Sequence, residues 1–378
     1  MWGALAERGR PTIVRMPRKQ TTVEAVAAQV AGRAPVDEEK TVDPRTYLPT
    51  GSSMLNCVCS GDPRGAFPAG EMVNLIGDKS TGKTMVYFDM LASIATKRRF
   101  DDYRLIHRDV EHRLQFNLGH LFGQRLVDRL DEGDAPRTMD DMIADLAQLK
   151  KDGRPFIYGL DSFDTLSDAE DLKQMDKKSS KGDTDADGKK KKGSFGLAKV
   201  KGLGFLLRNI IADLEEMGSL LVIISQVRQN MDAKSSQKYY RTGGYSLGHH
   251  CSHEIWLLNG GKLHRTVRER KRQIGVHTIA KCTKNSTTGF IRECEFDIYP
   301  DYGLDDVGGC VDFLVDEVFW GTSKQSIVAG KLGTMSRVKL IKLLESDRTL
   351  FTDVRKQVGK GWTEIEESLR LKRQNKYE

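Results

Sequence analysis

Short apolar runs alternate with amphipathic stretches along most of the chain. The strand-like runs cover residues 72–76, 104–109, 156–161 and 220–225. Between them, apolar side chains recur at helical spacing over residues 85–96, 139–150 and 205–217. Strands that alternate with helices of this length predict an α/β fold built on a doubly wound, mostly parallel sheet.

Capping and turn signals refine this pattern. The capping box Thr21-x-x-Glu24 precedes a short amphipathic helix, which cannot bury its apolar stripe alone. We therefore expect this helix to dock on the core or on a neighbouring subunit. A second box, Thr138-x-x-Asp141, opens the helix at 139–150. Strand-like residues 276–282 and 292–299, separated by a glycine-containing loop, predict a hairpin at the far edge of the sheet.

The chain then divides into three expected parts. Residues 1–45 form an N-terminal tail with an oligomerisation helix, and residues 46–318 form the sheet-containing core. After Trp320 the pattern changes to short, charged helices. Residues 319–378 are therefore expected to form a small helical C-terminal module.

Composition narrows the class of protein. The chain has 378 residues, of which 38% are hydrophobic, enough for one large α/β domain with smaller attachments. The formal charge of +7 is modest for this size, so any binding of polyanions depends on where the charge lies. The six cysteines include no C-x-x-C pair and are expected to be reduced thiols. No run of eighteen apolar residues occurs, so we expect no membrane span and a cytoplasmic protein.

A phosphate-binding motif, G-x-x-x-x-G-K-T, stands between the first apolar run and the first helix. It consists of Gly77, Asp78, Lys79, Ser80, Thr81, Gly82, Lys83 and Thr84, and Met85 follows it. Its glycines allow backbone N–H groups to face phosphate oxygens, and the helix adds the positive end of its dipole. Lys83 is expected to contact the β- and γ-phosphates, and Thr84 to contact Mg²⁺. The motif predicts binding of ATP or GTP.

Polar side chains follow the carboxyl ends of three strands, where ligands bind in sheets of this kind. Asp161 closes an apolar strand, the usual arrangement of a carboxylate that holds Mg²⁺. Glu111 follows the strand at 104–109 and is placed to polarise an attacking water, while Gln226 follows the strand at 220–225 and is placed to sense the γ-phosphate. Each alone is also typical of a solvent-exposed strand end. Together with the phosphate loop they favour hydrolysis.

The order of these motifs resembles that of RecA-type DNA recombinases. The matching segments are Thr50-Gly51-Ser52, Asp109-x-Glu111-His112, Asp161-Ser162, Ser225-Gln226-Val227-Arg228 and Thr242-Gly243-Gly244-x-x-Leu247. The resemblance covers roughly residues 45 to 300. It implies that Glu111 is the catalytic carboxylate and that Gln226 couples the γ-phosphate to the loop after it. It also implies ATP and Mg²⁺ as cofactors.

The resemblance further implies two DNA-binding loops. The expected DNA-binding residues are Phe195, Gly196, Lys199, Arg228, Met231, Arg241, Gly243 and Gly244. Residues 228–244 interleave arginine and lysine with tyrosine, a composition suited to phosphate contact and base stacking, although a solvated surface loop has similar features. The lysine-rich stretch at 171–201 is an insertion relative to the family's first loop.

In this family, basic residues of one subunit reach the γ-phosphate bound by the next. Lys281 and Lys284 are the candidates, although their spacing is one residue wider than the recombinase pattern. The resemblance thus implies a DNA-dependent ATPase that forms helical filaments on single-stranded DNA, pairs it with double-stranded DNA in recombination and repair, and associates with the nucleoid. Two alternatives stay open: a replicative helicase-like ATPase, which residues 285–289 also resemble, and a regulatory or partner-loading ATPase.

Overall fold

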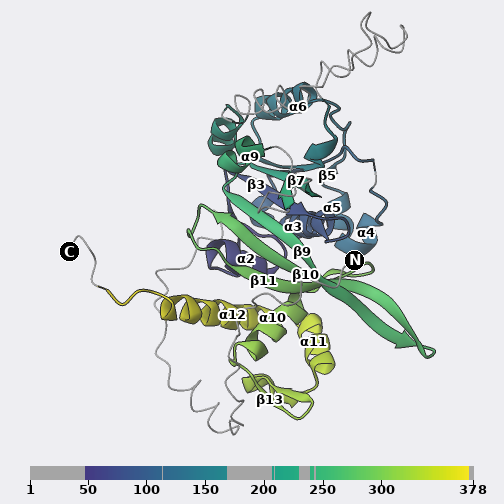
Figure 1. Cartoon of the computed structure of the whole chain (residues 1–378), viewed down its shortest axis with the longest axis vertical. Helices are drawn as coiled ribbons and strands as arrows, with labels where there is room; N and C mark the ends of the chain where they lie inside the picture. The colour runs from purple at the N-terminus through teal and green to yellow at the C-terminus, as the bar shows by residue number, and fades with distance from the viewer. Residues whose placement is uncertain are drawn as a thin grey trace, which may run out of the picture.

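A mixed sheet forms the centre of the molecule (Figure 1). The computed structural model describes residues 47–112, 114–167, 207, 209–229, 239–241 and 244–373. In spatial order the strands are β12 (Gly303–Leu304), β11 (Glu293–Tyr299), β10 (Arg270–Asn285), β9 (His253–Val267), β3 (Met72–Gly77), β7 (Leu220–Gln229), β6 (Phe156–Asp161), β4 (Arg104–Asp109) and β5 (Leu130–Asp131). A tenth strand, β8 (Tyr239–Arg241), pairs with β7.

The sheet is parallel from β9 to β5 and antiparallel from β9 to β12. The predicted α/β fold is therefore confirmed, and the sheet is more mixed than expected. The predicted hairpin at the far edge is present as β10 and β11, with only the two-residue β12 beyond it. The strand expected at residues 220–225 continues to Gln229, because its last residues pair with β8.

Two apolar clusters cover the two faces of the parallel strands. In β7, Leu220, Val222 and Ile224 belong to one cluster, whereas Leu221 and Ile223 belong to the other. This alternation follows from the period of two along a strand. Because both faces are buried, β7 is a continuous apolar run from Leu220 to Ile224.

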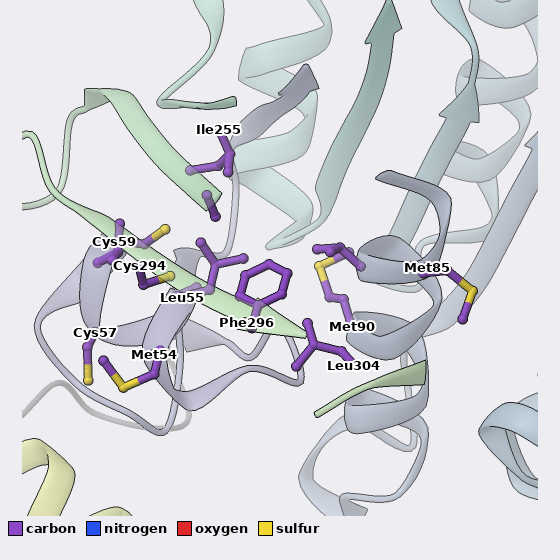
Figure 2. Packing of buried hydrophobic residues seen from close by; sticks show 14 of the residues in the cluster. Met54, Leu55, Cys57, Cys59, Met85, Met90, Ile255, Cys294, Phe296 and Leu304 are labelled. Carbon is purple, nitrogen blue, oxygen red and sulfur yellow. The ribbon is translucent and has the colours of Figure 1, made fainter. Parts of the chain in front are cut away.

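Helices supply the other half of each cluster. The first face is covered by α2 (Ser53–Ser60), α3 (Lys83–Ala95) and α10 (Asp306–Asp316). The second is covered by α6 (Met139–Asp152), helical residues 209–217 and α9 (Gly244–His250). Figure 2 shows side chains of α2, α3 and β11 converging around Phe296 in the first cluster. The predicted capping box opens α6: Thr138 accepts from the backbone N–H of Asp141, whose carboxylate accepts in return.

The C-terminal segment is more varied than the predicted short helices. It contains a small sheet of β13 (Gly321–Ser323), β14 (Ser326–Val328) and β15 (Thr334–Met335), followed by α11 (Arg337–Ser346) and the 21-residue α12 (Arg348–Ser368). Trp320, Val358 and Trp362 belong to the first core cluster, and Arg355 of α12 forms an ion pair with Asp306 of α10. The segment thus packs against the core, and the domain boundary at residue 319 stays a prediction.

Several short elements complete the description. These are β1 (Tyr47–Leu48), β2 (Phe67–Pro68), α4 (Leu118–Phe122), α5 (Gln124–Val127) and the 3₁₀ turns η2 (Arg98–Phe100), η3 (Phe163–Thr165) and η4 (Gly330–Leu332). The expected N-terminal helix at residues 1–45 lies outside the described residues. No helix in the described ranges is both long and apolar enough to cross a membrane.

Candidate nucleotide site at the carboxyl ends of the parallel strands

The phosphate loop connects the end of β3 to the start of α3, as predicted. Gly77 is the last residue of β3, and Gly82 caps α3 with a φ of 89°. A Cβ atom on Gly82 would lie 2.2 Å from Cδ1 of Ile298, and one on Gly77 would lie 2.8 Å from the carbonyl oxygen of Leu257. Glycine is therefore required at Gly82 by its backbone conformation and at Gly77 by the nearby backbone oxygen, whereas the end of the Ile298 side chain could move.

The Lys83 ammonium group lies within the loop. Its Nζ donates to the carbonyl oxygens of Gly77 and Asp78 at 2.9 and 2.8 Å. Burial lowers the pKa of Lys83, and the nearby carboxylates of Asp161 and Glu111 oppose this shift. The side chain is thus already positioned at the loop whose N–H groups and helix dipole favour an anion.

Thr84, in the first turn of α3, contacts Asp161 at the carboxyl end of β6. The Thr84 hydroxyl donates to Oδ2 of Asp161 at 2.6 Å. Burial raises the pKa of Asp161 to about 6, and the negative charges of Glu111 and Asp109 add to this effect. A divalent cation would relieve this excess of negative charge, so the pair fits Mg²⁺.

The protein alone supplies few ligands for a metal ion. Within the described ranges, no group of three or more His, Cys, Asp or Glu side chains is arranged to hold one. In phosphate-transfer sites, Mg²⁺ is usually coordinated by one or two protein oxygens, with waters and substrate phosphates as the other ligands.

Strand register brings the remaining site residues together. Asp109 of β4 is paired with Asp161 of β6, and Gly77 of β3 is paired with Gln226 of β7. Glu111, two residues beyond the end of β4, is hydrogen-bonded by side chains that follow β6 and belong to β7. Its Oε1 accepts hydrogen bonds from the hydroxyl of Ser162 at 2.6 Å and from the side-chain amide of Gln226.

One residue of this group was not predicted. Asp164, in η3, accepts a hydrogen bond from the backbone N–H of Gln226, with its Oδ2 at 2.7 Å. Gln226 is therefore held at two points, by its backbone to Asp164 and by its side chain to Glu111. Nothing in the local pattern of apolar strand followed by acid marks Asp164, because its partner lies 62 residues later.

The two candidate lysines of β10 differ in their surroundings. Lys284 donates to the carbonyl oxygens of Gly248 and His249 at 2.8 and 2.9 Å, at the C-terminal end of α9. The Lys281 side chain is 46% exposed, and its Nζ lies 3.5 Å from Glu293. Among the described residues, neither lysine has a hydrogen bond or ion pair with the phosphate loop of its own chain.

The expected DNA-binding residues are only partly covered by the description. Phe195, Gly196, Lys199, Met231 and Gly243 lie outside the described residues. The backbones of Arg228 and Arg241 belong to the antiparallel pair β7 and β8, with Arg228 opposite Tyr240 and Arg241 opposite Val227. Gly244 is the first residue of α9. The segment after Gln226 thus begins and ends with paired strand residues, 227–229 and 239–241, where we had expected a loop.

Comparison with known proteins agrees with this geometry. No protein-family model matches the chain. The chain is 26% identical over 274 residues to "Protein RecA" of Ruminococcus albus, covering 71% of this chain and 61% of that protein. It is 23% identical over 316 residues to "Protein RecA" of Caulobacter vibrioides, covering 81% of this chain and 79% of that protein. The chain is therefore distantly similar to RecA proteins over most of its length, which supports a RecA-type ATPase at the level of the family.

Proposed function

We propose that the chain is a DNA-dependent ATPase that forms filaments on single-stranded DNA and catalyses homologous pairing and strand exchange. One observation carries the proposal. Glu111, the carboxylate suited to orient water, shares a hydrogen bond with Gln226, and β7 continues from Gln226 into the β7–β8 hairpin. A ligand that moves this hairpin therefore acts on the carboxylate through a single residue.

The side chains have separate roles in this mechanism. Lys83 holds the β- and γ-phosphates, and Thr84 and Asp161 supply oxygens to Mg²⁺. Mg²⁺ held there would supply positive charge which, together with the loop, would neutralise the charge that develops on the phosphates during hydrolysis. Glu111 orients the attacking water and accepts its proton. Movement of Gln226 toward the γ-phosphate withdraws its amide from Glu111, which frees the carboxylate for this task.

A neighbouring subunit completes the site in this proposal. Lys281 is the better candidate to reach the next subunit, because it is exposed and has only a long ion pair with Glu293. Such surface pairs contribute about 0.2–1 kcal/mol and are easily exchanged. Lys284 is instead bound to two carbonyl oxygens at the end of α9. We assign it the role of connecting β10 to the helix that follows the hairpin.

The proposal also assigns a role to each part of the chain, including residues that the structure does not describe. Residues 195–199 and 228–244 contribute the two DNA-binding loops, and the helix within residues 1–45 joins neighbouring subunits. The core at 46–318 carries the ATPase, and residues 319–378 form a smaller module. Because DNA is the partner, we place the protein in the cytoplasm at the nucleoid.

Two substitutions test the hydrolytic mechanism. Lys83→Ala removes the charge on the phosphates and is expected to abolish ATP hydrolysis. Glu111→Gln keeps the size of the side chain but cannot accept a proton, so we expect the DNA-stimulated rate to fall about 10²–10⁴-fold while binding to DNA persists. Glu132→Gln, an exposed glutamate elsewhere, is the matched control. Hydrolysis at the parent rate by Glu111→Gln with DNA present would contradict the mechanism.

The same assays separate the two alternatives. A regulatory or partner-loading ATPase would show no increase in hydrolysis on addition of single-stranded DNA. A helicase-like ATPase would unwind forked duplexes in the presence of ATP. The proposed recombinase is expected to hydrolyse ATP faster when single-stranded DNA is added. It is expected to pair homologous strands and not to unwind forked duplexes.

A further inference from the structure

A two-stranded ribbon extends beyond the sheet at the β9–β10 connection (Figure 1). β9 pairs with β3 only over residues 253–257, and β10 pairs with β11 only over residues 276–281. From residue 258 to residue 275 the two strands pair only with each other. The register shifts between Gln273 and Gly275 and between His277 and Thr278, which places bulges where the ribbon leaves the sheet.

The ribbon carries a dense positive charge. Between residues 262 and 272 only Glu269 is acidic, and the basic residues are Lys262, Arg265, Arg268, Arg270, Lys271 and Arg272. All six are exposed. Residues 270–272 lie opposite residues 265–267, so the six charges lie within about seven residues of extended strand, a rod of roughly 20 Å.

These charges have no acidic partners within the part of the chain that the structure describes. No carboxylate oxygen of a described residue lies within 4.0 Å of any of the six. Arg265 and Arg272 even stand directly opposite each other across the ribbon, an arrangement that destabilises a strand pair. At the root of the ribbon the situation is reversed: His277 lies against Asp297 and Glu295, and Lys281 lies against Glu293. Among the described residues, the lack of ion pairs is thus particular to the cations of the outer part of the ribbon.

The turn at the tip adds a second observation. Arg268 and Glu269 have φ angles of 49° and 61°. A two-residue turn with both angles positive ordinarily carries Asn-Gly or Asp-Gly, because larger side chains cost about 1–2 kcal/mol each in this conformation. Here the position that favours asparagine is occupied by Arg268 and the position that favours glycine by Glu269, so the strained turn presents one cation and one carboxylate at the tip.

We propose that the ribbon of residues 258–275 is a binding arm for double-helical nucleic acid, gripped through its phosphates. Each strand of duplex DNA presents about one negative charge per 3.4 Å, which is close to the mean spacing of six cations along about 20 Å. A two-stranded β-ribbon also fits the major groove, which is about 12 Å wide. Single strands are usually held by stacking on aromatic rings, and residues 258–275 contain no Phe, Tyr or Trp.

The arm goes beyond the proposed function, because it is a nucleic-acid site separate from the nucleotide site and from the hairpin after Gln226. It requires neither ATP nor Mg²⁺. Its test can therefore be made without nucleotide, and its outcome does not depend on whether the chain hydrolyses ATP.

The first test removes charge from the arm. The arm variant changes Arg265, Arg270, Lys271 and Arg272 to Gln, and the control variant changes four exposed lysines elsewhere, Lys331, Lys339, Lys342 and Lys360, to Gln. Binding to a fluorescent 30-base-pair duplex is followed by anisotropy between 50 and 200 mM salt, without nucleotide. We expect the arm variant to bind about tenfold or more weakly, with a salt slope smaller by about 3 to 4, because each phosphate contact contributes about 0.9. Equal affinities and slopes for the two variants would overturn the proposal.

The second test leaves every charge in place. All six native cysteines are buried, so Thr266→Cys at the exposed outer part of the arm can be labelled selectively with a fluorophore. Addition of duplex is expected to change the signal of the label with the dissociation constant seen by anisotropy. A signal that responds to polyglutamate and not to duplex would mean a protein partner, and no response to either would mean no binding at the arm. Both results would refute the assignment.

Discussion

Asp164 provides the sharpest test of the link between the hairpin and the hydrolytic carboxylate. Its Oδ2 accepts the backbone N–H of Gln226 at 2.7 Å in a partly buried setting. A hydrogen bond to a charged group contributes about 1.5–3 kcal/mol. If this energy holds Gln226 where hydrolysis needs it, Asp164→Ala reduces the DNA-stimulated rate about 10- to 150-fold. Asp164→Asn retains a neutral acceptor and is expected to lose about half of that free energy.

Steady-state hydrolysis with and without single-stranded DNA measures this effect. Asp164 positions Gln226 and does not contact the phosphates in our account, so we expect kcat with DNA to fall while KM for ATP changes little. The exposed Asp134→Ala serves as the matched control for loss of one acidic charge. A graded loss in the order wild type, Asn, Ala supports the reasoning. Asp164→Ala with the stimulation of the wild type would refute it.

Two further predictions concern stability. Lys284→Ala removes two hydrogen bonds to carbonyl oxygens at the end of α9 and is expected to lower the free energy of unfolding by about 1–2 kcal/mol in urea titrations. Lys281→Ala is expected to lower it by less than about 0.5 kcal/mol. Equal effects of the two substitutions would contradict the role of Lys284. Burial raises the pKa of Asp89 from 3.8 to about 8, so the folded state binds the extra proton and stability falls as pH rises between these values. Asp89→Asn should therefore gain up to about 1.4 kcal/mol per pH unit relative to wild type across this window, and parallel curves of unfolding free energy against pH would argue against it.

The parallel half of the sheet was predictable from local sequence. Its strands are buried on both faces, so residues 72–76, apart from Asn74, and residues 156–160 appear as apolar runs bounded by turns and acids. The phosphate loop was predictable for a related reason. Its glycines are required by a backbone φ and by close contacts that no other residue tolerates.

Elements that depend on distant contacts were missed. Only residues 253–257 of β9 pair with β3. The remainder of β9 belongs to a charged, glycine-containing ribbon without an apolar face. α10 contains Gly308 and Gly309, which disfavour a helix by about 1 kcal/mol each. It forms because Asp305 caps it and because Val307, Cys310, Val311 and Leu314 pack into the first core cluster.

The candidate site shows the same division. Lys83, Thr84 and Glu111 follow strand ends, Asp161 closes β6, and Gln226 of β7 lies opposite the end of β3. The topology of a parallel sheet brings these positions together. Asp164 acquires its role only when η3 and β7 lie side by side, which no spacing within either segment reveals. The charge of the arm was visible in the sequence, but its arrangement on one projecting ribbon was not. Only the pairing of β9 with β10 shows that the charges lie together on a ribbon that extends beyond the sheet.

Direct imaging tests the central claim most simply. The protein is mixed with a slowly hydrolysed ATP analogue and single-stranded DNA and examined by electron microscopy. Our account predicts regular helical filaments along the DNA, which fail to form when the analogue is omitted. Closed rings, or particles that do not assemble on DNA, would contradict it.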